Sequence, residues 1–493
     1  MRDTIFYASK DEKITPQEIA HADLARKLAG ECMVLLENDG VLPLKSRGEI
    51  ALYGNGVRKT IQGGTGSGSV NTRSITNIEK GFEEAGFTVT NKAWLDANDE
   101  HYKKMQEAYQ EWLEEEGKRR NVPPFLVSFD QPFSEPAPYT ISEEEVAGCK
   151  AKIAVYVISR NSGEGKDREY REGDYLFYPE ELDGIRNLIA GGKKLIVVLN
   201  IGGVMQLTEL KKIIGINAIV LMNQLGNLGG NALVDLISGA VTPSGKLADT
   251  WAVEYKDYPS SATFSHNNGN VDEEYYQEGI YVGYRYFDSF GVTPLYPFGY
   301  GLSYTSFDIK TVKVEQKSEF IAVSVKVRNT GDYYAGKEVV QIYLSKPQGQ
   351  MDMPYQELVA FKKTEELRPG EEECIDLEFP LELLAGYDTD SAAYLVEAGD
   401  YIVRVGTDSA STQAVAVLTV KSRTMLKQCE NMAFADEKLE EVKPVRKAVK
   451  EEALWAIQLD LSRITPKTVS YTREHVQLVN TVKDQITMRD VLD

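Results

Sequence analysis

Cysteine and histidine are scarce in this sequence, since the chain of 493 residues holds only four of each. The cysteines, Cys32, Cys149, Cys374 and Cys429, stand far apart, and no CxxC pair occurs. The histidines are scattered as well, so neither set has the spacing of zinc ligands. The sequence therefore predicts no metal site, and it predicts free thiols in a reducing compartment.

The sequence also lacks long apolar runs. Its first residues, "MRDTIFYASKDEK", contain no apolar stretch of the kind found in signal peptides. No run approaches the ~18 apolar residues that a membrane-spanning helix needs. We therefore expect no signal peptide and no membrane span, and we expect a cytoplasmic protein.

An excess of positive charge is missing too, because the formal net charge is −20. An acidic surface repels the phosphates of nucleic acids and of anionic membranes, so we expect neither as a partner. Solubility is the simplest explanation of the charge. The 42% of hydrophobic residues is typical of a globular protein, and the length indicates about two to four domains.

The first half of the chain has the pattern of an α/β sandwich. A lead-in segment, residues 1–45, has apolar positions at helical spacing over residues 16–36. Over residues 46–260, continuous apolar strands alternate with amphipathic helices, which predicts a mostly parallel sheet with helices on both faces. A charged helical stretch and a proline-rich loop interrupt this alternation at about 91–140, and we interpret them as an insertion.

The second half has a different period. After a connecting segment, residues 261–305, apolar and polar residues alternate over 306–420, with turn sequences such as "RPGE" and "EAGD" between the runs. Period two with regular turns predicts an antiparallel β-sandwich. Residues 421–493 are charged and mostly helical in pattern, so we expect a helical tail without a core of its own.

A glycine-rich turn, "QGGTGSGSVN" over residues 62–71, is the first candidate for a binding site. It matches neither GxGxxG nor a GK[ST] loop, so it does not indicate a nucleotide site. Its glycines would let backbone amides approach a ligand closely, and Ser67 and Thr65 could hydrogen-bond a hydroxylated ligand. On composition alone, a surface turn explains the segment at least as well.

The second candidate is the charged segment Ser159–Tyr175, which directly follows a buried strand. Ligand sites of open α/β sheets lie beyond the carboxyl ends of the strands, where this segment and the glycine-rich turn would meet. Glu164 stands there between two glycines, and a solvated charge run is the alternative interpretation. Three nearby cations could tune the pKa of Glu164, namely Lys166, Arg168 and Arg171.

Several motifs together resemble the non-barrel part of glycoside hydrolase family 3, the β-glucosidase family. The first motifs are "ARKLAGECMVLLENDGVLPL" (25–44), "GGTGSG" (63–68) and "SRNSGEGKDRE" (159–169). The later ones are "GNLGGNALVDLISGAVTPSGKLADTW" (226–251), "EGIYVGYRYFD" (278–288), "PLYPFGYGLSYTSF" (294–307) and "ELRPGE" (366–371). The resemblance extends over roughly residues 16–420 and implies that 306–420 is a fibronectin type III-like domain.

This resemblance implies a hydrolase of carbohydrate metabolism, a retaining and exo-acting β-glycosidase. Glu164 matches the general acid/base of the family, and Ser67 matches the hydroxyl of its glycine-rich substrate loop. We also place Gly66 and Arg168 among the substrate-binding residues. The implied substrate is a β-linked oligosaccharide or a β-glucoside with a terminal glucosyl residue, and no metal or organic cofactor is implied.

The sequence departs from the family pattern in one respect. Neither an "SDW"-like nor a "KHF"-like string is present, and no room is left for a (β/α)8 barrel of about 250 residues, which carries the nucleophilic Asp. We therefore expect the first part of an enzyme with reversed domain order, whose barrel acts in cis or in trans and without which the chain is inactive. The apolar surface that a barrel would cover is expected to favour a homodimer or aggregation. A non-catalytic carbohydrate-binding or structural assembly module is the alternative function.

Overall fold

A six-stranded sheet organises the first half of the chain in the computed structural model, which describes residues 13–164, 167–432, 439–444, 453–462 and 464–469. The strands run in the order β1-β6-β5-β4-β2-β3, and all neighbours are parallel except β1 and β6. Their bounds are Val34–Asn38 (β1), Glu49–Tyr53 (β2), Thr88–Val89 (β3), Ile153–Arg160 (β4), Lys194–Ile201 (β5) and Ile216–Leu221 (β6). The central strands β4 and β5 are buried almost throughout, as expected for a sheet covered on both faces.

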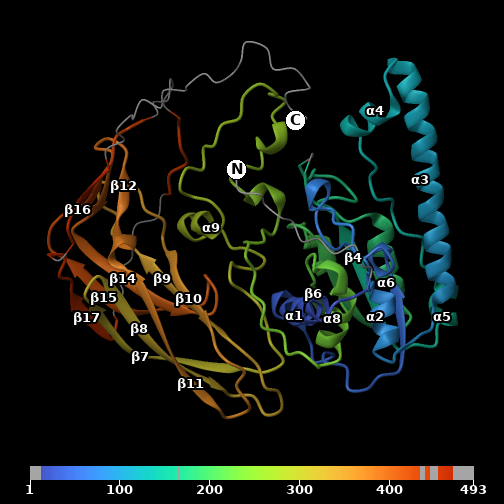
Figure 1. Cartoon of the computed structure of the whole chain (residues 1–493), viewed down its shortest axis with the longest axis horizontal. Coiled ribbons are helices and arrows are strands. Elements are labelled where there is room, and N and C mark those ends of the chain that lie inside the picture. Colours follow the sequence, from blue (N-terminus) through green and yellow to red (C-terminus); the bar gives the residue numbers. More distant parts are fainter. Residues whose placement is uncertain (1–12, 165–166, 433–438, 445–452, 463, 470–493) are drawn as a thin grey trace.

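Helices cover both faces of this sheet, which confirms the predicted α/β sandwich (Figure 1). The helices of the described residues are Pro16–Cys32 (α1), Ile78–Glu84 (α2), Lys92–Arg120 (α3), Pro124–Asp130 (α4), Glu143–Gly148 (α5), Pro179–Ala190 (α6), Thr208–Lys211 (α7), Gly229–Ile237 (α8) and Tyr284–Phe290 (α9). Of these, α4 lies against α3 and α9 lies beside the β-sandwich, away from the sheet. The chain moves in opposite directions along the sheet after β2 and after β4. Right-handed crossovers therefore put α2 and α6 on opposite faces.

The helical spacing predicted over residues 16–36 is correct only as far as Cys32. Helix α1 begins with a capping box, in which the Thr15 side chain accepts from Glu18 N and Glu18 accepts from Thr15 N. Residues 34–38 form β1 instead of continuing the helix. A short apolar run fits either a helix or a buried strand, and pairing with β6 decides for the strand here.

The long helix α3 leaves the sheet from the end of β3 and extends well beyond its upper edge, where α4 folds back beside it (Figure 1). Its first turns are anchored, because Trp94 is 3% exposed and packs edge-on against Tyr53, with ring centroids 4.9 Å apart. The Asn91 side chain also exchanges hydrogen bonds with the backbone of Leu52 on β2. The chain between α4 and α5 then passes over the carboxyl end of β4, where the Ser159 hydroxyl bonds Glu135.

Antiparallel strands form the second half of the chain as a β-sandwich with its own hydrophobic core, which confirms that prediction. A five-stranded sheet, β10-β9-β14-β15-β17, faces a three-stranded sheet, β11-β8-β7, and a four-stranded sheet, β12-β13-β16-β18, lies beside them. The strands are Phe307–Lys317 (β7), Phe320–Asn329 (β8), Val339–Ser345 (β9), Glu357–Lys363 (β10), Glu372–Pro380 (β11), Gly386–Asp388 (β12), Ala393–Val396 (β13), Gly399–Gly406 (β14), Thr412–Val420 (β15), Thr424–Gln428 (β16), Trp455–Gln458 (β17) and Lys467–Thr468 (β18).

The prediction of a helical tail is wrong for those residues of 421–469 that the structure describes. They form the strands β16, β17 and β18 and no helix, while residues 470–493 lie outside the described part. Strand β17 pairs in parallel with β15 at the edge of the five-stranded sheet. An open sheet edge offers unpaired backbone groups, so a charged segment with a few apolar residues is stabilised there as a strand.

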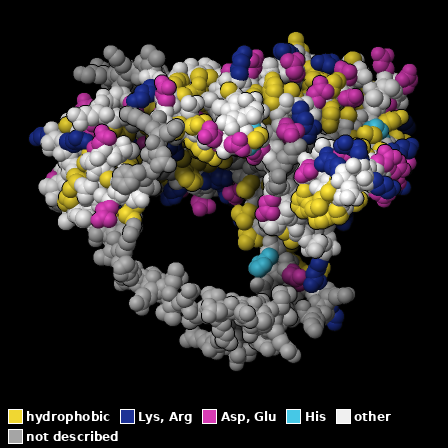
Figure 2. All heavy atoms as spheres, turned by 90° about the horizontal axis from the view of Figure 1, so that it is seen from above, with side chains coloured by type: hydrophobic (Ala, Val, Ile, Leu, Met, Phe, Trp, Pro, Cys, Tyr) yellow, Lys and Arg dark blue, Asp and Glu magenta, His cyan; other side chains and the backbone are white. Residues whose placement is uncertain are grey.

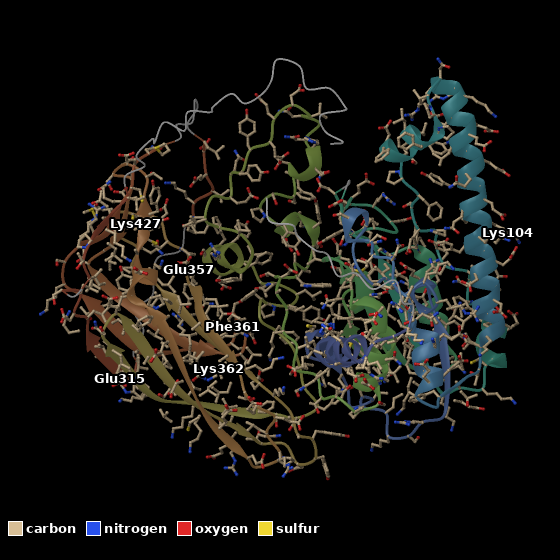
Figure 3. The ribbon with its side chains drawn as sticks, viewed as in Figure 1. Lys104, Glu315, Glu357, Phe361, Lys362 and Lys427 are labelled. Carbon is tan, nitrogen blue, oxygen red and sulfur yellow. The ribbon has the colours of Figure 1, made fainter. Side chains whose placement is uncertain are left out.

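Ion pairs and a shared cavity join the two halves of the chain. Glu31 on α1 accepts from Lys337 at 2.7 Å and from Lys363 at 3.4 Å, both from the β-sandwich. Phe361 on β10 lies on the side of the sandwich that faces the α/β domain (Figure 3) and lines a cavity of about 420 Å³ together with Leu247. These contacts are those expected of a sandwich that braces the α/β domain.

One face of the molecule shows how its surface charges are distributed. On the face shown in Figure 2, both kinds of charge are interspersed, and hydrophobic side chains form small groups between them. Within the described ranges, no helix combines the length and the apolar character needed to cross a membrane.

Candidate active site

The sheet reverses its strand order between β2 and β4, and this point positions the candidate site. From β2 the chain proceeds to β3 on one side, and from β4 it proceeds to β5 and β6 on the other. The loops that leave the carboxyl ends of β2 and β4 therefore lead toward opposite sides of the sheet, and the position between their starts, which we call the crevice, is where open α/β sheets usually bind ligands. The glycine-rich segment follows β2 and the charged segment follows β4, so the two predicted candidates flank this crevice.

The turn out of β2 depends on a glycine. Gly54 has φ +93°, and a Cβ at this residue would lie 2.1 Å from the carbonyl oxygen of Val157 on β4. Only glycine allows this backbone angle and this approach together. The chain can therefore turn directly across the end of β4 and bring the glycine-rich loop over the crevice.

A buried asparagine fastens the base of the glycine-rich loop. Asn200 at the end of β5 is fully buried, and its amide oxygen accepts from Ile61 N at 2.7 Å. Its amide nitrogen donates to Ile61 O at 3.0 Å and to Asn223 O at 2.7 Å. Gly226 N also donates to Gln62 O at 2.8 Å. These bonds tie the loop after β2 to the loop after β6, because the polar groups of both would otherwise be buried without partners.

Glu164 and Ser67 are in direct contact across the crevice. Ser67 N donates to Oε2 of Glu164 at 2.9 Å, and the Ser67 hydroxyl donates to Oε1. Glu164 N donates to Thr65 O at 3.4 Å. The structure thus brings together two residues that lie 97 positions apart in the sequence and that were both predicted for the site.

Two glycines make this contact sterically feasible. Gly66 has φ +74°, and a Cβ there would lie 2.5 Å from Oε2 of Glu164. A Cβ on Gly163 would lie 2.3 Å from Thr65 N. A side chain at either position would push the loops apart, so the predicted importance of Gly66 has a structural reason in the approach of the carboxylate.

The contact with Ser67 also affects the acidity of Glu164. The hydrogen bonds from the Ser67 side chain and then from its backbone N–H lower the pKa of Glu164, whose carboxylate is exposed. Hydrogen bonds to the charged form favour ionisation. The contact with Ser67 therefore favours the charged form of Glu164 in this arrangement.

Two of the predicted cations, Arg168 and Arg171, do not shift the pKa of Glu164 as expected. Arg168 pairs with the carboxylate of Asp174 and donates to Asp174 O at 2.9 Å, and Arg171 pairs with Glu169 at 2.6 Å. Neither forms a bond with Glu164 in the described part of the chain, and Lys166 lies outside it. Each arginine has a carboxylate of its own within the loop, which accounts for the difference.

A buried ion pair that the sequence analysis missed holds the charged loop in place. Arg160, the last residue of β4, forms two hydrogen bonds with Glu181 on α6, at 2.6 and 2.9 Å. Both side chains are 5% exposed. Arg160 also donates to the backbone oxygens of Asp174 and Leu176, which fixes the far end of the loop. The only sequence signal was a charged residue that ends an apolar strand.

A second carboxylate near this edge was also missed, because it lies within residues 91–140, which we interpret as an insertion. Glu135 accepts a hydrogen bond from the Ser159 hydroxyl at 3.1 Å. Burial raises the pKa of Glu135. The Tyr178 hydroxyl donates to the Glu135 backbone oxygen at 2.7 Å, so this residue links the insertion to the loop after β4.

All four cysteines are free, and the described residues contain no group of three or more His, Cys, Asp or Glu placed to hold a metal.

Comparisons with known proteins identify both halves of the chain. Residues 33–284 match the Glycosyl hydrolase family 3 C-terminal domain, and residues 338–409 match the Fibronectin type III-like domain. Beta-glucosidase A of Butyrivibrio fibrisolvens is 34% identical over 448 residues, with 82% of this chain and 51% of that protein covered. A beta-glucosidase of Ruminococcus albus is 32% identical over 422 residues, with 83% of this chain and 42% of that protein covered.

Solved structures show the same likeness. The structure of beta-glucosidase 3B from Thermotoga neapolitana in complex with α-D-glucose is 37% identical, with a TM-score of 0.72, and the match covers 83% of this chain and 55% of that one. A beta-glucosidase from Paenibacillus barengoltzii is 33% identical with a TM-score of 0.71, and 83% of this chain and 45% of that one are covered. The chain spans about half the length of the curated relatives that it matches.

Proposed function

The chain belongs to glycoside hydrolase family 3, and we propose that it supplies the general acid/base, Glu164, of a retaining and exo-acting β-glucosidase-like enzyme. Such an enzyme hydrolyses terminal β-linked glucosyl residues of oligosaccharides or β-glucosides. The observation that carries this proposal is the contact of Glu164 with the Ser67 loop at the strand-order reversal. Both residues match motif positions for which the resemblance to the family implies a proton donor and a sugar contact.

The second carboxyl group comes from a (β/α)8 barrel domain, in the same polypeptide or in another. A retaining mechanism needs a nucleophile and an acid/base with their carboxyl groups about 5–5.5 Å apart. Glu164 protonates the leaving oxygen in the first step while the barrel aspartate attacks the sugar. In the second step, Glu164 takes a proton from the water that hydrolyses the covalent intermediate.

Ser67 switches Glu164 between its two roles. In the structure, both groups of Ser67 donate to the carboxylate and lower its pKa. A sugar hydroxyl that takes the Ser67 hydrogen bond removes part of this stabilisation, and enclosure by the barrel removes water. Both changes raise the pKa of Glu164, so that the carboxyl group can carry the proton that the leaving oxygen needs.

The chain alone is inactive under this proposal, because Glu164 is exposed and its pKa is lowered without a sugar and a barrel. That same observation favours the second candidate function, a non-catalytic carbohydrate-binding or assembly module. The two candidates differ in what a barrel adds. An enzyme half gains turnover when the barrel is supplied, whereas a binding module does not.

The test is a mixing experiment. The chain is combined with the barrel domain of a family member, and hydrolysis of an aryl β-glucoside is followed. We expect turnover above the sum of the two halves, and we expect the Glu164→Gln chain to lower it, least for aryl groups that leave readily and most for leaving groups that need protonation. Turnover no higher than that of either half alone would count against the catalytic role. Binding of the barrel, measured by size-exclusion chromatography, separates failed assembly from failed chemistry.

A further inference from the structure

The hairpin of α3 and α4 projects beyond the upper edge of the sheet and exposes apolar side chains at its tip (Figure 1). On α4, Phe125 is 60% exposed, Phe129 is 73% exposed and Leu126 is 44% exposed. The two phenyl rings pack edge-on with their centroids 5.3 Å apart, so they form one exposed aromatic group. Apolar side chains gathered on the surface of a projecting element are typical of a protein–protein contact.

The turn between α3 and α4 holds this aromatic group in a fixed position. Asn121 ends α3 in the left-handed conformation, with φ +51°, and its N–H donates to Lys118 O at 3.3 Å. Val122 N donates to Gly117 O at 3.0 Å, and a Cβ on Gly117 would lie 2.9 Å from Val122 O. The Tyr109 hydroxyl, farther back on α3, donates to the backbone oxygen that ends α4 at 2.7 Å. Because α4 is fastened at both ends, its rings are presented without loss of order on binding.

A hollow of about 500 Å³ lies on the same hairpin. Its walls are the last turns of α3 and the turn at residues 122–124, which contributes Val122 and two prolines. The hollow is wide enough for a phenyl ring, and this part of its lining is apolar. In a two-fold symmetric contact each chain presents the same patch, so a protruding group and a hollow on one patch can fill each other reciprocally.

Two unpaired charges beside the hollow are complementary in the same way. Glu114 and Lys118 both line it, four residues apart on α3. Glutamate and lysine at this spacing often pair within a helix, but neither has an ion-pair partner among the residues that the structure describes. When two copies of α3 lie antiparallel across a two-fold axis, Glu114 of each copy faces Lys118 of the other. The contact then contains two ion pairs of the same kind.

The remaining charges of the tip offer little to a polyanion. Arg120 pairs with Asp130 at 3.0 Å, and Arg119 donates to Glu116 at 2.6 Å. Each guanidinium already has a carboxylate, so a nucleic acid or an anionic lipid would have to displace it. A protein surface of the same mixed composition has no such cost.

We infer that the α3/α4 hairpin is the interface through which two copies of this chain associate. Phe125 and Phe129 of each copy are seated in the hollow of the other, and Glu114 pairs with Lys118 across the axis. Because the hairpin extends beyond the sheet, the copies meet through it without contact between their sheets (Figure 1). This inference concerns assembly and does not depend on the role of Glu164.

Sedimentation velocity of the chain, at roughly 1–100 µM, tests the interface. We expect a concentration-dependent species of twice the mass of one chain. Phe125→Asp and Phe129→Asp should each weaken dimerisation by at least about 30-fold, as loss of a buried aromatic anchor does. Tyr333→Asp is the matched control, because it places the same charge on a tyrosine that is 86% exposed on the β-sandwich, and it should dimerise like the unchanged chain. Circular dichroism checks that every variant is folded.

A charge exchange tests the two-fold arrangement itself. Glu114→Lys brings like charges together across the axis, and Lys118→Glu does the same, so each should weaken dimerisation. The double variant Glu114→Lys/Lys118→Glu restores opposite charges at both contacts and should recover it. A double variant that is as weak as either single variant would contradict the antiparallel pairing.

Three outcomes would overturn the interface. The chain stays monomeric up to about 100 µM, or Phe129→Asp dimerises as tightly as Tyr333→Asp. In the third outcome, Phe129→Asp leaves the dimer intact but abolishes binding of an added barrel domain, which would make the hairpin a contact with the barrel.

Discussion

Removal of one partner from the Arg160–Glu181 pair should destabilise the α/β domain far more than removal of both. Glu181→Leu leaves a buried guanidinium without its carboxylate, since both side chains are 5% exposed. Loss of one partner of a buried pair costs about 3–5 kcal/mol. That is a large part of the roughly 5–15 kcal/mol by which domains are stable.

The double variant Arg160→Met/Glu181→Leu has no buried charge left from this pair. It still loses the hydrogen bonds from Arg160 to the backbone oxygens of Ser159, Asp174 and Leu176 and the bond from Tyr178 N to Glu181, at about 1 kcal/mol each. The desolvation cost of the buried pair disappears with the pair and offsets part of this loss, so we expect a net cost of about 2 kcal/mol, less than that of Glu181→Leu alone.

Urea unfolding followed by circular dichroism measures these differences. Asp183→Ala, on the same helix, removes one partner of the exposed Arg186–Asp183 pair, whose side chains are 50% and 67% exposed. This control should change stability by less than about 1 kcal/mol. A double variant that is less stable than Glu181→Leu would refute the reasoning, because the uncompensated charge would then not be the main cost.

The remaining predictions concern the crevice. Ser67→Ala removes the side-chain donor to Glu164, so the pKa of Glu164 should rise toward its ordinary value. Carboxyl ¹³C NMR over pH measures this, and an unchanged titration would show that Ser67 does not lower the pKa of Glu164. Gly66→Ala should impair activity of the barrel-containing enzyme, because its Cβ would lie 2.5 Å from Oε2 of Glu164. Gly68→Ala is the matched control, since a Cβ there meets no atom within 4 Å, and equal loss in both variants would speak against the steric explanation.

The sequence predicted the architecture because the two halves have different periods. The apolar strands around "KIAVYVIS" gave a parallel sheet, and the alternating strands after residue 305 gave a sandwich. It failed where local pattern is ambiguous. Residues 34–38 pair with β6 instead of extending a helix. Residues Trp455–Gln458 form a strand because they pair with β15 at the edge of the five-stranded sheet.

The candidate site was predictable to a similar degree. Loops that follow neighbouring parallel strands meet beyond the carboxyl ends of those strands. From this rule, the sequence alone predicted that the loops of Glu164 and Ser67 lie close together. The ion pairs of Arg168 with Asp174 and of Arg160 with Glu181 join residues that are 6 and 21 positions apart. Such pairs depend on side-chain packing, which the spacing of apolar residues does not predict. Glu135 was hidden in the insertion, whose path over β4 only the structure reveals.

The most direct test of Glu164 as acid/base compares leaving groups in the barrel-containing enzyme. For Glu164→Gln, we predict that kcat/KM falls by about 10²–10⁴-fold on substrates with poor leaving groups, which need protonation. Substrates with good leaving groups should suffer less, and azide should partly rescue them by attacking the intermediate in place of activated water. Kinetics that are unchanged, or that fall equally for both kinds of leaving group without rescue by azide, would contradict the role of Glu164.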